Sequence, residues 1–461
     1  MEHNSIRDRL NGSGNVLSRY LSGSKSQIAI DALLQGTSLG CGFKELVGKS
    51  ILLTTHNQFA AALALIELDG IAKRLIICPP DIQPGHFPLV IAKGGVDAIV
   101  SDHELDGQRA FDGILRVSCG HPIVPSEPSR SVSRETEWVL LTSGTTGAPK
   151  MIAHTLASLT APISVKQPAP LGSALVWGTF YDIRRYGGLQ IFLRGILGTG
   201  SLVLPDTAES VGDHLIRLGA SGVTHLTGTP SHWRRALMSP YINRISPRYV
   251  RLSGEIADQA ILNTLHSVFP EASICHAFAS TEAGVAFEVN DGLAGFPASL
   301  LGTQGEVEMK VENDTLRIKS NRNALCYPDG GHGPLAGADG FVDTGDVVEL
   351  RDGRYYFLGR VNGVINVGGM KVYPEEVEAV INCHPAVRMS MVRPRKNSIT
   401  GALVSADIVL KEGSDAAGIE LKGEILELCR KSLPPHKIPA TIRLVQALEV
   451  AAAGKLVRSH A

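Results

Sequence analysis

Hydrophobic and polar positions form two different patterns along the chain. In the first, short apolar runs alternate with helical stretches. Between residues 51 and 100, the apolar runs ILLTT, RLIIC and DAIV are separated by helical stretches at residues 57–68 and 86–93. The same arrangement returns between residues 174 and 269, with the runs ALVWGTF, GSLVLP, GVTHLTG and YVRLSG. Short buried-type strands that alternate with helices predict βαβ units and a parallel sheet.

After residue 302 the period changes to two, in GEVEMKVENDTLRIKS and in residues 341–357, and the turn pairs Asn313-Asp314 and Asp352-Gly353 indicate β-hairpins. A Gly-rich segment, GRVNGVINVGG, then precedes a compact stretch with predicted helices at residues 375–382 and near 420–431. We place a domain boundary in that Gly-rich segment.

The predicted fold class is α/β. A large N-terminal domain (1–359) has parallel-type sheets with helices plus a small β-rich subdomain. A hinge (360–363) connects it to a small mobile α+β C-terminal domain (364–461), which we expect to act as a lid.

Composition narrows the function classes. The 461 residues carry 44 Lys plus Arg and 45 Asp plus Glu, so no overall field attracts nucleic acid or an anionic membrane. The seven cysteines are scattered without a CxxC pair, which is typical of a reduced protein without a zinc site. Residues 1–20 lack the apolar core of a signal peptide, and the apolar run at 59–66 is too short to span a bilayer. We expect a soluble cytoplasmic protein with no nucleic-acid or membrane partner.

The sharpest chemical signal is LLTSGTTGAPK at residues 140–150, a strand end followed by small, hydroxylated and glycine residues and then a lysine. Glycines let backbone N–H groups approach a polyphosphate, hydroxyls add donors, and the lysine adds a compact positive charge. The spacing is not that of a Walker A loop, and a flexible linker would not need Pro-Lys after a buried-type strand. The candidate phosphate contacts are Thr142, Ser143, Gly144, Thr145, Thr146, Gly147 and Lys150.

Two carboxylates are further candidates. Glu282 follows Ser280 and Thr281, so it could supply an oxygen ligand to Mg²⁺ beside a hydroxyl-rich loop, although a helix N-terminal carboxylate is an alternative. Asp346 follows a predicted strand and could accept both hydroxyls of a ribose, although a turn aspartate is equally ordinary for a single TGD. Neither residue is specific when taken alone.

The run SGTTGAPK resembles the phosphate loop of the adenylate-forming superfamily, which contains acyl-CoA and aryl-CoA ligases, peptide-synthetase adenylation domains and luciferases. Further matches follow in the family's order. FASTEAG (278–284) resembles its adenine and magnesium motif, FVDTGD (341–346) its ribose motif, residues 359–376 its hinge motif, and Gly454-Lys455 its C-terminal catalytic lysine. LSGE (252–255) resembles the segment at the other face of adenine. The ordered set is far more specific than any single match.

The resemblance implies ATP, Mg²⁺ and coenzyme A as ligands, with Lys455, Glu282 and Thr281 catalytic, Glu282 at the metal and Asn362 as the hinge pivot. The nucleotide and coenzyme A contacts that it implies, besides the phosphate loop, are Ser253, Gly254, Glu255, Ala277, Phe278, Ala279, Ser280, Asp346, Arg360, Gly368 and Gly369. The chain departs from the family at Phe278, usually tyrosine, at Ala279, usually glycine, and at Asn362, commonly aspartate or lysine.

The acid pocket corresponds to WGTFYDIRRYGG at residues 177–188. We expect aromatic side chains to line it and Arg184 or Arg185 to pair with a second polar group on the acid; a surface loop with solvated arginines is the alternative. The candidate pocket residues are Trp177, Phe180, Tyr181, Asp182 and Arg184, with Tyr186 nearby.

The expected reaction is ATP-dependent activation of a carboxylic acid to acyl-AMP with release of pyrophosphate, followed by transfer to the thiol of coenzyme A. The acid is expected to be an aryl or short acyl acid. One alternative is a stand-alone adenylation enzyme that loads an amino or aryl acid onto a separate carrier protein. Another is a catalytically silent nucleotide-binding module, against which intact Lys150, Glu282, Asp346 and Lys455 argue.

Overall fold

Two mostly parallel β-sheets form the larger part of the molecule. The computed structural model describes residues 5–12, 19–105, 109–120, 122–125, 134–142, 149–163, 175–330, 333–411, 418–450 and 454–456. Within these ranges, strands and helices alternate as the hydrophobic pattern predicts, and the predicted α/β class is confirmed.

The first sheet has six strands in the spatial order β10-β9-β5-β4-β6-β7. Their bounds are β10 Lys150–His154, β9 Glu137–Thr142, β5 Arg74–Cys78, β4 Ser50–Thr54, β6 Ala98–Ser101 and β7 Leu115–Ser118. All neighbours are parallel except β10, which is antiparallel to β9 at one edge. The central strands are apolar runs because helices cover both faces; every residue of β4 is buried.

The second sheet has eight strands in the order β16-β15-β14-β13-β11-β12-β1-β2. Their bounds are β16 Gly284–Val289, β15 Ser273–Ser280, β14 Tyr249–Ser253, β13 His225–Gly228, β11 Val176–Thr179, β12 Ser201–Val203, β1 Tyr20–Ser22 and β2 Gln27–Ala29. The six inner strands are parallel, and the two edge strands are antiparallel to their neighbours. Their carboxyl ends therefore share one edge, where open sheets of this kind bind ligands.

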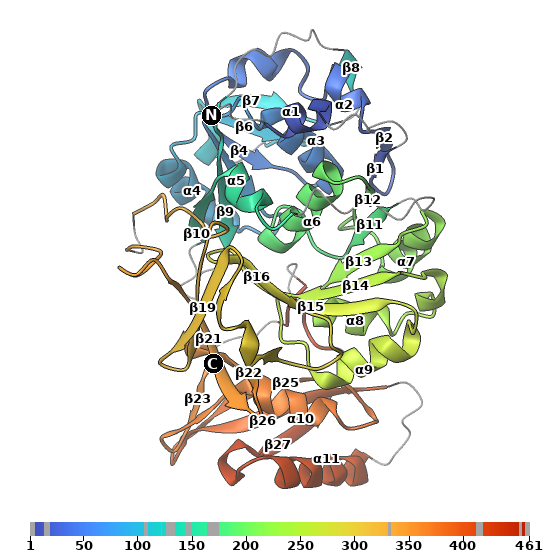
Figure 1. Ribbon diagram of the computed structural model, residues 1–461, viewed down its shortest axis with the longest axis vertical. Helices are drawn as coiled ribbons and strands as arrows, with labels where there is room; N and C mark the ends of the chain where they lie inside the picture. Colours follow the sequence, from blue (N-terminus) through green and yellow to red (C-terminus); the bar gives the residue numbers. More distant parts are fainter. Residues whose placement is uncertain are drawn as a thin grey trace.

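Helices fill the space between the two sheets and cover their outer faces. Helices α3 (Gln58–Leu68) and α6 (Tyr186–Leu197) share one core with residues of both sheets. Helix α4 (Phe87–Gly94) packs on the far face of the six-stranded sheet. Helices α7 (Val211–Ala220), α8 (Pro230–Ala236) and α9 (Gln259–Val268) cover the far face of the eight-stranded sheet (Figure 1).

The predicted helix at residues 57–68 shows why the elements form where they do. Asn57 caps its start, and its side chain accepts a hydrogen bond from the backbone N–H of Phe59 at 2.7 Å. Apart from Gln58 and Glu67 its residues are apolar on every side, which suits a helix whose residues are all buried. Smaller elements nearby are α1 Ile6–Gly12, α2 Ala32–Gln35, α5 Leu156–Thr160 and the pair β3 Gly36–Thr37 with β8 Val124–Pro125.

The third sheet consists of antiparallel hairpins in the order β17-β22-β21-β20-β19-β18. Its strands are β17 Phe296–Pro297, β22 Arg354–Arg360, β21 Val342–Arg351, β20 Thr315–Ser320, β19 Val307–Glu312 and β18 Gly302–Gln304. The two predicted turn pairs, Asn313-Asp314 and Asp352-Gly353, each have φ positive at both residues. Such turns match the twist of the strands they join, which confirms the predicted hairpins.

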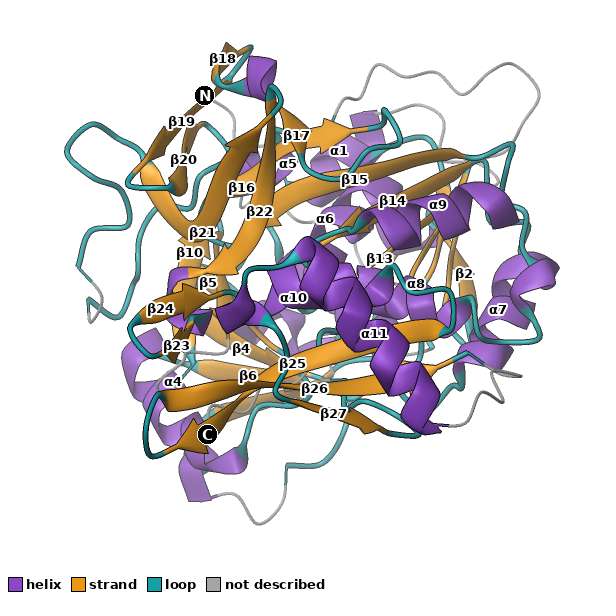
Figure 2. Cartoon of the chain, turned by 90° about the horizontal axis from the view of Figure 1, so that it is seen from below, coloured by secondary structure: helices purple, strands orange, loops and turns teal. Residues whose placement is uncertain are grey.

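The C-terminal sheet lies below the other sheets in Figure 1 and has the order β24-β23-β26-β25, with β27 beside β26. Its elements are β23 Ile365–Val367, β24 Met370–Val372, α10 Pro374–Asn382, β25 Val387–Asn397, β26 Gly401–Leu410, α11 Gly418–Ser432 and β27 Thr441–Leu444. Helices α10 and α11 share one core with the strands and lie over β25 and β26 (Figure 2). The hinge predicted at 360–363 lies between β22 and β23 and stays a prediction.

None of the helices in the described ranges has the length and apolar character that crossing a bilayer requires.

Candidate active site

A cavity of about 660 Å³ lies where the eight-stranded sheet, the hairpin sheet and the C-terminal domain meet. Its walls include the carboxyl ends of β14 and β15, the first residues of α6 and α8, strands β21 and β22, and one side of α10. This size is typical of small-molecule sites. The topology therefore brings together segments from residue 140 to residue 456 at one place.

The two ends of the predicted phosphate loop line this cavity. Thr142 ends β9 and Lys150 begins β10, and the two residues pair directly across the antiparallel ladder. Its candidates Ser143, Gly144, Thr145, Thr146 and Gly147 lie outside the described residues.

Glu282 lies in the cavity wall, in the tight turn between β15 and β16. Backbone contacts hold this turn from several sides. His154 contacts the Thr281 carbonyl through Nε2 at 2.8 Å, the Ala324 N–H donates to the Glu282 carbonyl at 2.9 Å, and the Ala283 N–H donates to Ser280 Oγ at 2.9 Å. Burial lowers the pKa of His154 to about 4, so this imidazole is neutral and donates at neutral pH. The Glu282 carboxylate is thus left to the cavity.

Asp346 and Arg360 lie opposite each other on β21 and β22. Arg360 Nε lies 3.2 Å from Asp346 Oδ1, and Arg360 Nη2 donates to the Thr344 carbonyl at 3.2 Å. Burial raises the pKa of Asp346 above its usual range, although Arg360 opposes the shift. Both side chains line the cavity, so the carboxylate and the guanidinium can face one ligand together.

Lys455, from the end of the chain, also lies in this cavity. A side chain placed on Gly254 would begin 3.5 Å from Lys455 Cε and 3.9 Å from its Nζ, so the lysine passes directly over the turn after β14. Burial lowers the pKa of Lys455, and Arg360 lowers it further, while Glu255 and Asp346 raise it. The C-terminal domain is therefore closed over the N-terminal one, with its lysine at the shared cavity.

Three residues that anchor the lysine segment were not predicted from the sequence, or not in this role. Thr229 Oγ1 donates to the Gly454 carbonyl at 2.6 Å, and the Leu456 N–H donates to Glu255 Oε1 at 3.2 Å. The His232 ring fills the space beside Gly454, where a Cβ would lie only 1.8 Å from its Cε1. The Thr229-Pro230 pair is a typical helix start. From the sequence, this pair could have predicted the start of α8, where Thr229 and His232 lie.

The proposed adenine-side residues surround the ends of β14 and β15. Those lining the cavity are Ser253, Gly254, Glu255, Ala277, Phe278, Ala279 and Ser280. The Phe278 ring already stacks on Phe357, with centroids 5.1 Å apart, and on Phe287 at 5.9 Å. The Glu255 carboxylate accepts hydrogen bonds from Ser231 as well as from Leu456, so it organises the protein around the turn.

The proposed coenzyme A contacts Gly368 and Gly369 do not line the cavity. They form the turn between β23 and β24, where the Gly368 N–H donates to the Thr400 carbonyl at 2.9 Å. Asn362, by contrast, does line the cavity and lies in the single 3₁₀ turn Val361–Gly363 between the two domains. In this closed arrangement the lysine is at the site and the glycine turn is away from it.

Only part of the predicted acid pocket faces the cavity. Tyr181 lines it and donates its hydroxyl to the Ser253 carbonyl at 2.8 Å, and Tyr186 lines it at the start of α6. Trp177 and Phe180 do not. The Trp177 side chain is buried between its own strand, β11, and helix α6, with its ring centroid 4.8 Å from that of His225. The Phe180 ring packs on that of Trp233, with the centroids 5.4 Å apart. Side-chain alternation places Phe180 on the opposite face from Tyr181. Trp177 is on the same face as Tyr181, but it lies four residues earlier, inside β11 and away from the carboxyl end of the strand.

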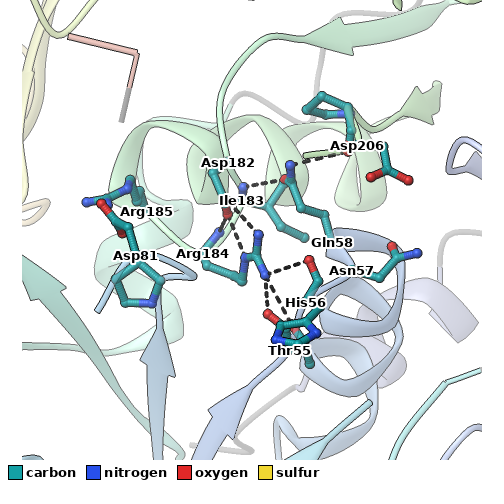
Figure 3. Close-up of polar contacts among 12 residues, drawn as sticks. Thr55, His56, Asn57, Gln58, Asp81, Asp182, Ile183, Arg184, Arg185 and Asp206 are labelled. Carbon is teal, nitrogen blue, oxygen red and sulfur yellow. Dashed lines mark hydrogen bonds and ion pairs between the residues drawn. The ribbon is translucent and has the colours of Figure 1, made fainter. Parts of the chain in front are cut away.

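Arg184 and Asp182 form a buried ion pair and do not offer free charges to a substrate. Arg184 is fully buried, and its Nε and Nη2 donate to the two oxygens of Asp182 at 2.8 and 2.6 Å. The same guanidinium also donates to the carbonyls of Thr55 and His56 (Figure 3). Arg184 therefore ties the start of α6 to the loop after β4, which corrects its predicted placement in the pocket. Arg185 lines the cavity and pairs with Asp81.

Comparisons with known proteins cover nearly the whole chain. The model of the AMP-binding enzyme family matches residues 83–336, and that of the AMP-binding enzyme C-terminal domain matches residues 376–455. The 2-succinylbenzoate–CoA ligase of Salmonella typhimurium is 26% identical over 399 residues, which cover 84% of this chain and 82% of that protein.

Two solved structures share the fold. The anthranilate CoA ligase AuaEII in complex with anthranoyl-AMP has a TM-score of 0.83 at 18% identity, covering 99% of this chain and 96% of that one. A benzoate CoA ligase from Burkholderia xenovorans LB400 has a TM-score of 0.80 at 18% identity, covering 98% of each chain.

Proposed function

The chain belongs to the AMP-binding enzyme family, and we propose that it activates a carboxylic acid with ATP and transfers the acyl group to the thiol of coenzyme A. The observation that carries this proposal is the position of Lys455. A lysine from the end of the chain lies in one cavity with Asp346, Arg360 and Glu282. These residues are far apart in sequence. A lysine beside the Asp346–Arg360 pair, which is proposed to bind the ribose, is suited to adenylation.

Carboxylates are poor electrophiles, so the acid must attack the α-phosphate of ATP while pyrophosphate leaves. Negative charge builds up on the non-bridging oxygens in this step. Lys455 would neutralise the acid and the α-phosphate, and Lys150 with the loop that it ends would hold the β- and γ-phosphates. Asp346 would accept the ribose hydroxyls while Arg360 keeps its carboxylate in place.

Mg²⁺ fits the residues present. This ion is usually held by one or two carboxylates together with substrate phosphates. Glu282 supplies one carboxylate in the cavity, in a turn that three backbone contacts fix. When bound, the ion would neutralise charge on the phosphates; the chain's own contribution is to hold the carboxylate toward them.

Thioester formation needs a second arrangement of the domains. Gly368 and Gly369 are outside the cavity in the closed arrangement, so we propose that the C-terminal domain rotates about Asn362 after adenylation. This rotation would withdraw Lys455 and bring the glycine turn to the acyl-adenylate. Turns with φ positive at both positions leave room for a narrow ligand such as the pantetheine chain.

The acid is proposed to be an aryl or short acyl acid. Tyr181 and Tyr186 bound the inner end of the cavity, and Gly187 and Gly188 add no side chains there. Flat acids suit such a space. The relatives named for succinylbenzoate, anthranilate and benzoate are consistent with this class.

A separate carrier protein is the alternative acceptor. If the acid were an amino acid, its ammonium group would need a carboxylate, and Asp182 is the acidic residue among the candidate pocket residues. Both Asp182 oxygens are already bound by Arg184, so this position does not favour an amino acid. An aryl acid loaded onto a carrier remains open to test.

The experiment is acid-dependent exchange of pyrophosphate into ATP across a panel of acids, followed by thioester formation with coenzyme A and with a pantetheinylated carrier. Exchange with at least one aryl or short acyl acid, and thioester with free coenzyme A, is the expected result. If exchange occurs and the acyl group is transferred to the carrier but not to coenzyme A, the carrier protein is the acceptor. Absence of exchange with every acid would remove the adenylation proposal.

A further inference from the structure

Polar residues occupy a helix–sheet interface that is normally apolar. Val250 and Leu252 of β14 face the core formed with α8 and α9. Side chains alternate along a strand, so Tyr249, Arg251 and Ser253 face the opposite side, toward α6. Polar groups buried between a sheet and a helix cost stability unless they are hydrogen-bonded. This face of β14 therefore requires an explanation beyond packing.

Arg251 is the least satisfied group at this interface. Its residue is 4% exposed, and its Nη2 lies 3.0 Å from Glu288 Oε1 on β16. Neither its Nε nor its Nη2 makes a hydrogen bond of good geometry to a described residue. A buried guanidinium with two such donors is costly, and native proteins rarely keep one without a reason.

Arg251 lies just behind the inner wall of the cavity. It precedes Ser253 by two residues on the same face of β14, roughly 6 to 7 Å along the strand. Ser253 lines the cavity, and so do Tyr181 and Tyr186, which both lie close enough to feel the charge of Arg251. Gly187 and Gly188 of α6 also line this end. Arg251 itself does not line the cavity in this structure, so a ligand group would reach its guanidinium by way of the two tyrosines.

The charge in this region is positive. Arg194 of α6 and Arg322 lie near Arg251 or its partners, and each also has an Nε without a hydrogen-bond partner among the described residues. Glu288 faces Arg251 and Arg194, and Glu306 lies near Arg322. The Glu288 side chain is 39% exposed and Glu306 is exposed, so both carboxylates can turn to solvent at little cost. Three guanidinium groups against two exposed carboxylates leave room for one more negative charge.

We propose that Arg251 binds a second carboxylate on the acid that the enzyme activates, so that the preferred substrate is a dicarboxylic acid. One carboxylate reacts at the phosphate end, near Lys455, and the other is held at the inner end by Arg251. The inference rests on the proposed function, whose pocket it specifies. It places specificity on β14, whereas the two arginines expected from the sequence, Arg184 and Arg185, pair with Asp182 and Asp81.

The test uses pairs of acids that differ only in the second charge. The pairs are the three benzenedicarboxylates against the matching methylbenzoates, and glutarate against pentanoate. Specificity constants for pyrophosphate exchange are measured for the wild-type chain and for Arg251→Met, Arg251→Lys and Arg217→Met. Arg217 is a matched control, because it is a partly buried arginine fully paired with Glu209 on the far face of the same sheet.

In the wild type, at least one dicarboxylate should have a higher specificity constant for pyrophosphate exchange than the methyl-bearing acid of the same pair. Arg251→Met should lower that dicarboxylate's specificity constant roughly 10- to 100-fold, the range for losing a charge-assisted contact. The methyl-bearing acid and the KM for ATP should stay unchanged, Arg251→Lys should restore part of the preference, and Arg217→Met should keep the wild-type ratio. Equal loss for both members of every pair, or a wild-type preference for the methyl-bearing acids, overturns the proposal.

Calorimetric binding of the same dicarboxylates separates the two proposals. If no acid supports exchange, the adenylation proposal fails, yet tighter binding to the wild type than to Arg251→Met would still support this pocket. Equal binding to both proteins would show that Arg251 does not bind the second carboxylate. The inference would then fail, while exchange with other acids would leave the proposed function standing.

Discussion

The two ends of the cavity differ in how their charged residues are used. At the nucleotide end, Lys455, Asp346, Arg360 and Glu282 all present charge to the cavity. At the acid end, Asp182 and Arg184 neutralise each other inside the protein. Asp346 and Arg360 also pair with each other, but through one contact of 3.2 Å that leaves the Arg360 side chain 61% exposed, whereas both Asp182 oxygens are bound by the fully buried Arg184. A charged residue near a site is thus available to a ligand only if its partners have not already occupied it fully. The following predictions test that difference, from the largest expected effect to the smallest.

The strongest test of the nucleotide end is Lys455→Ala. We expect acid-dependent pyrophosphate exchange to fall about 1,000-fold, because a preorganised charge at the reacting phosphate is lost. Supplied acyl-AMP should still react with coenzyme A, since that step is proposed to use the other domain arrangement. Rapid-quench assays of each half-reaction measure both.

Gly369→Leu is the matched variant for Lys455→Ala. A side chain at this turn should block thioester formation and leave exchange intact, the reverse pattern. Equal loss of both half-reactions in both folded variants would contradict the two-arrangement account and require one static site.

At the acid end, Arg184→Met should act on stability and not on substrate binding. Removing one partner of a fully buried pair leaves Asp182 with an unpaired charge, which costs roughly 3 to 5 kcal/mol of unfolding free energy. Denaturant unfolding measures this loss. The double variant Arg184→Met, Asp182→Asn should recover much of it.

The KM of the Arg184→Met variant for the acid tests whether Arg184 is unavailable to the substrate. It should be unchanged in the folded fraction of Arg184→Met. A large rise in this KM without loss of stability would return Arg184 to the substrate pocket.

Asp346→Ala tests the ribose contact. The variant should weaken ATP binding by roughly 2 to 4 kcal/mol, the range for a lost charge-assisted contact. Calorimetric titration with ATP measures it. Asp343→Ala is the control, because Asp343 lies on the same strand, is about half exposed and pairs with Arg317. ATP affinity that is equal in the two variants would take Asp346 out of the site.

The smallest effect concerns His154, which supports the turn of Glu282. Its pKa falls from 6.5 to about 4 on burial, so between these values the unfolded chain binds a proton that the folded chain does not. Stability should therefore fall as the pH drops from 6.5 toward 4, by at most about 1.4 kcal/mol per pH unit from this group. Urea unfolding of wild type and His154→Gln at several pH values measures it. The variant should lose stability less steeply; equal slopes would contradict a neutral buried His154.

The sequence by itself determined the alternation of strands and helices, the hairpins, and most of the nucleotide end. Asp346 was expected after a strand, whereas it lies inside β21, opposite Arg360. The local patterns that carried this information were apolar runs bounded by helices and the turn pairs Asn313-Asp314 and Asp352-Gly353. Such features depend on neighbours in the chain, and the ordered motifs added Lys455, whose role no local pattern indicates.

Only the tertiary structure decided which charges are free. Arg184 and Arg251 are both arginines beside the same helix; Arg184 has an acidic residue, Asp182, two positions earlier in the sequence, but its other partners lie far away in the chain. Arg184 meets Asp182 and the carbonyls of Thr55 and His56, whereas Arg251 faces a partly exposed Glu288 and two tyrosines. The availability of a buried charge depends on the groups that folding brings within a few ångströms of it. For these residues most of those groups come from distant parts of the chain.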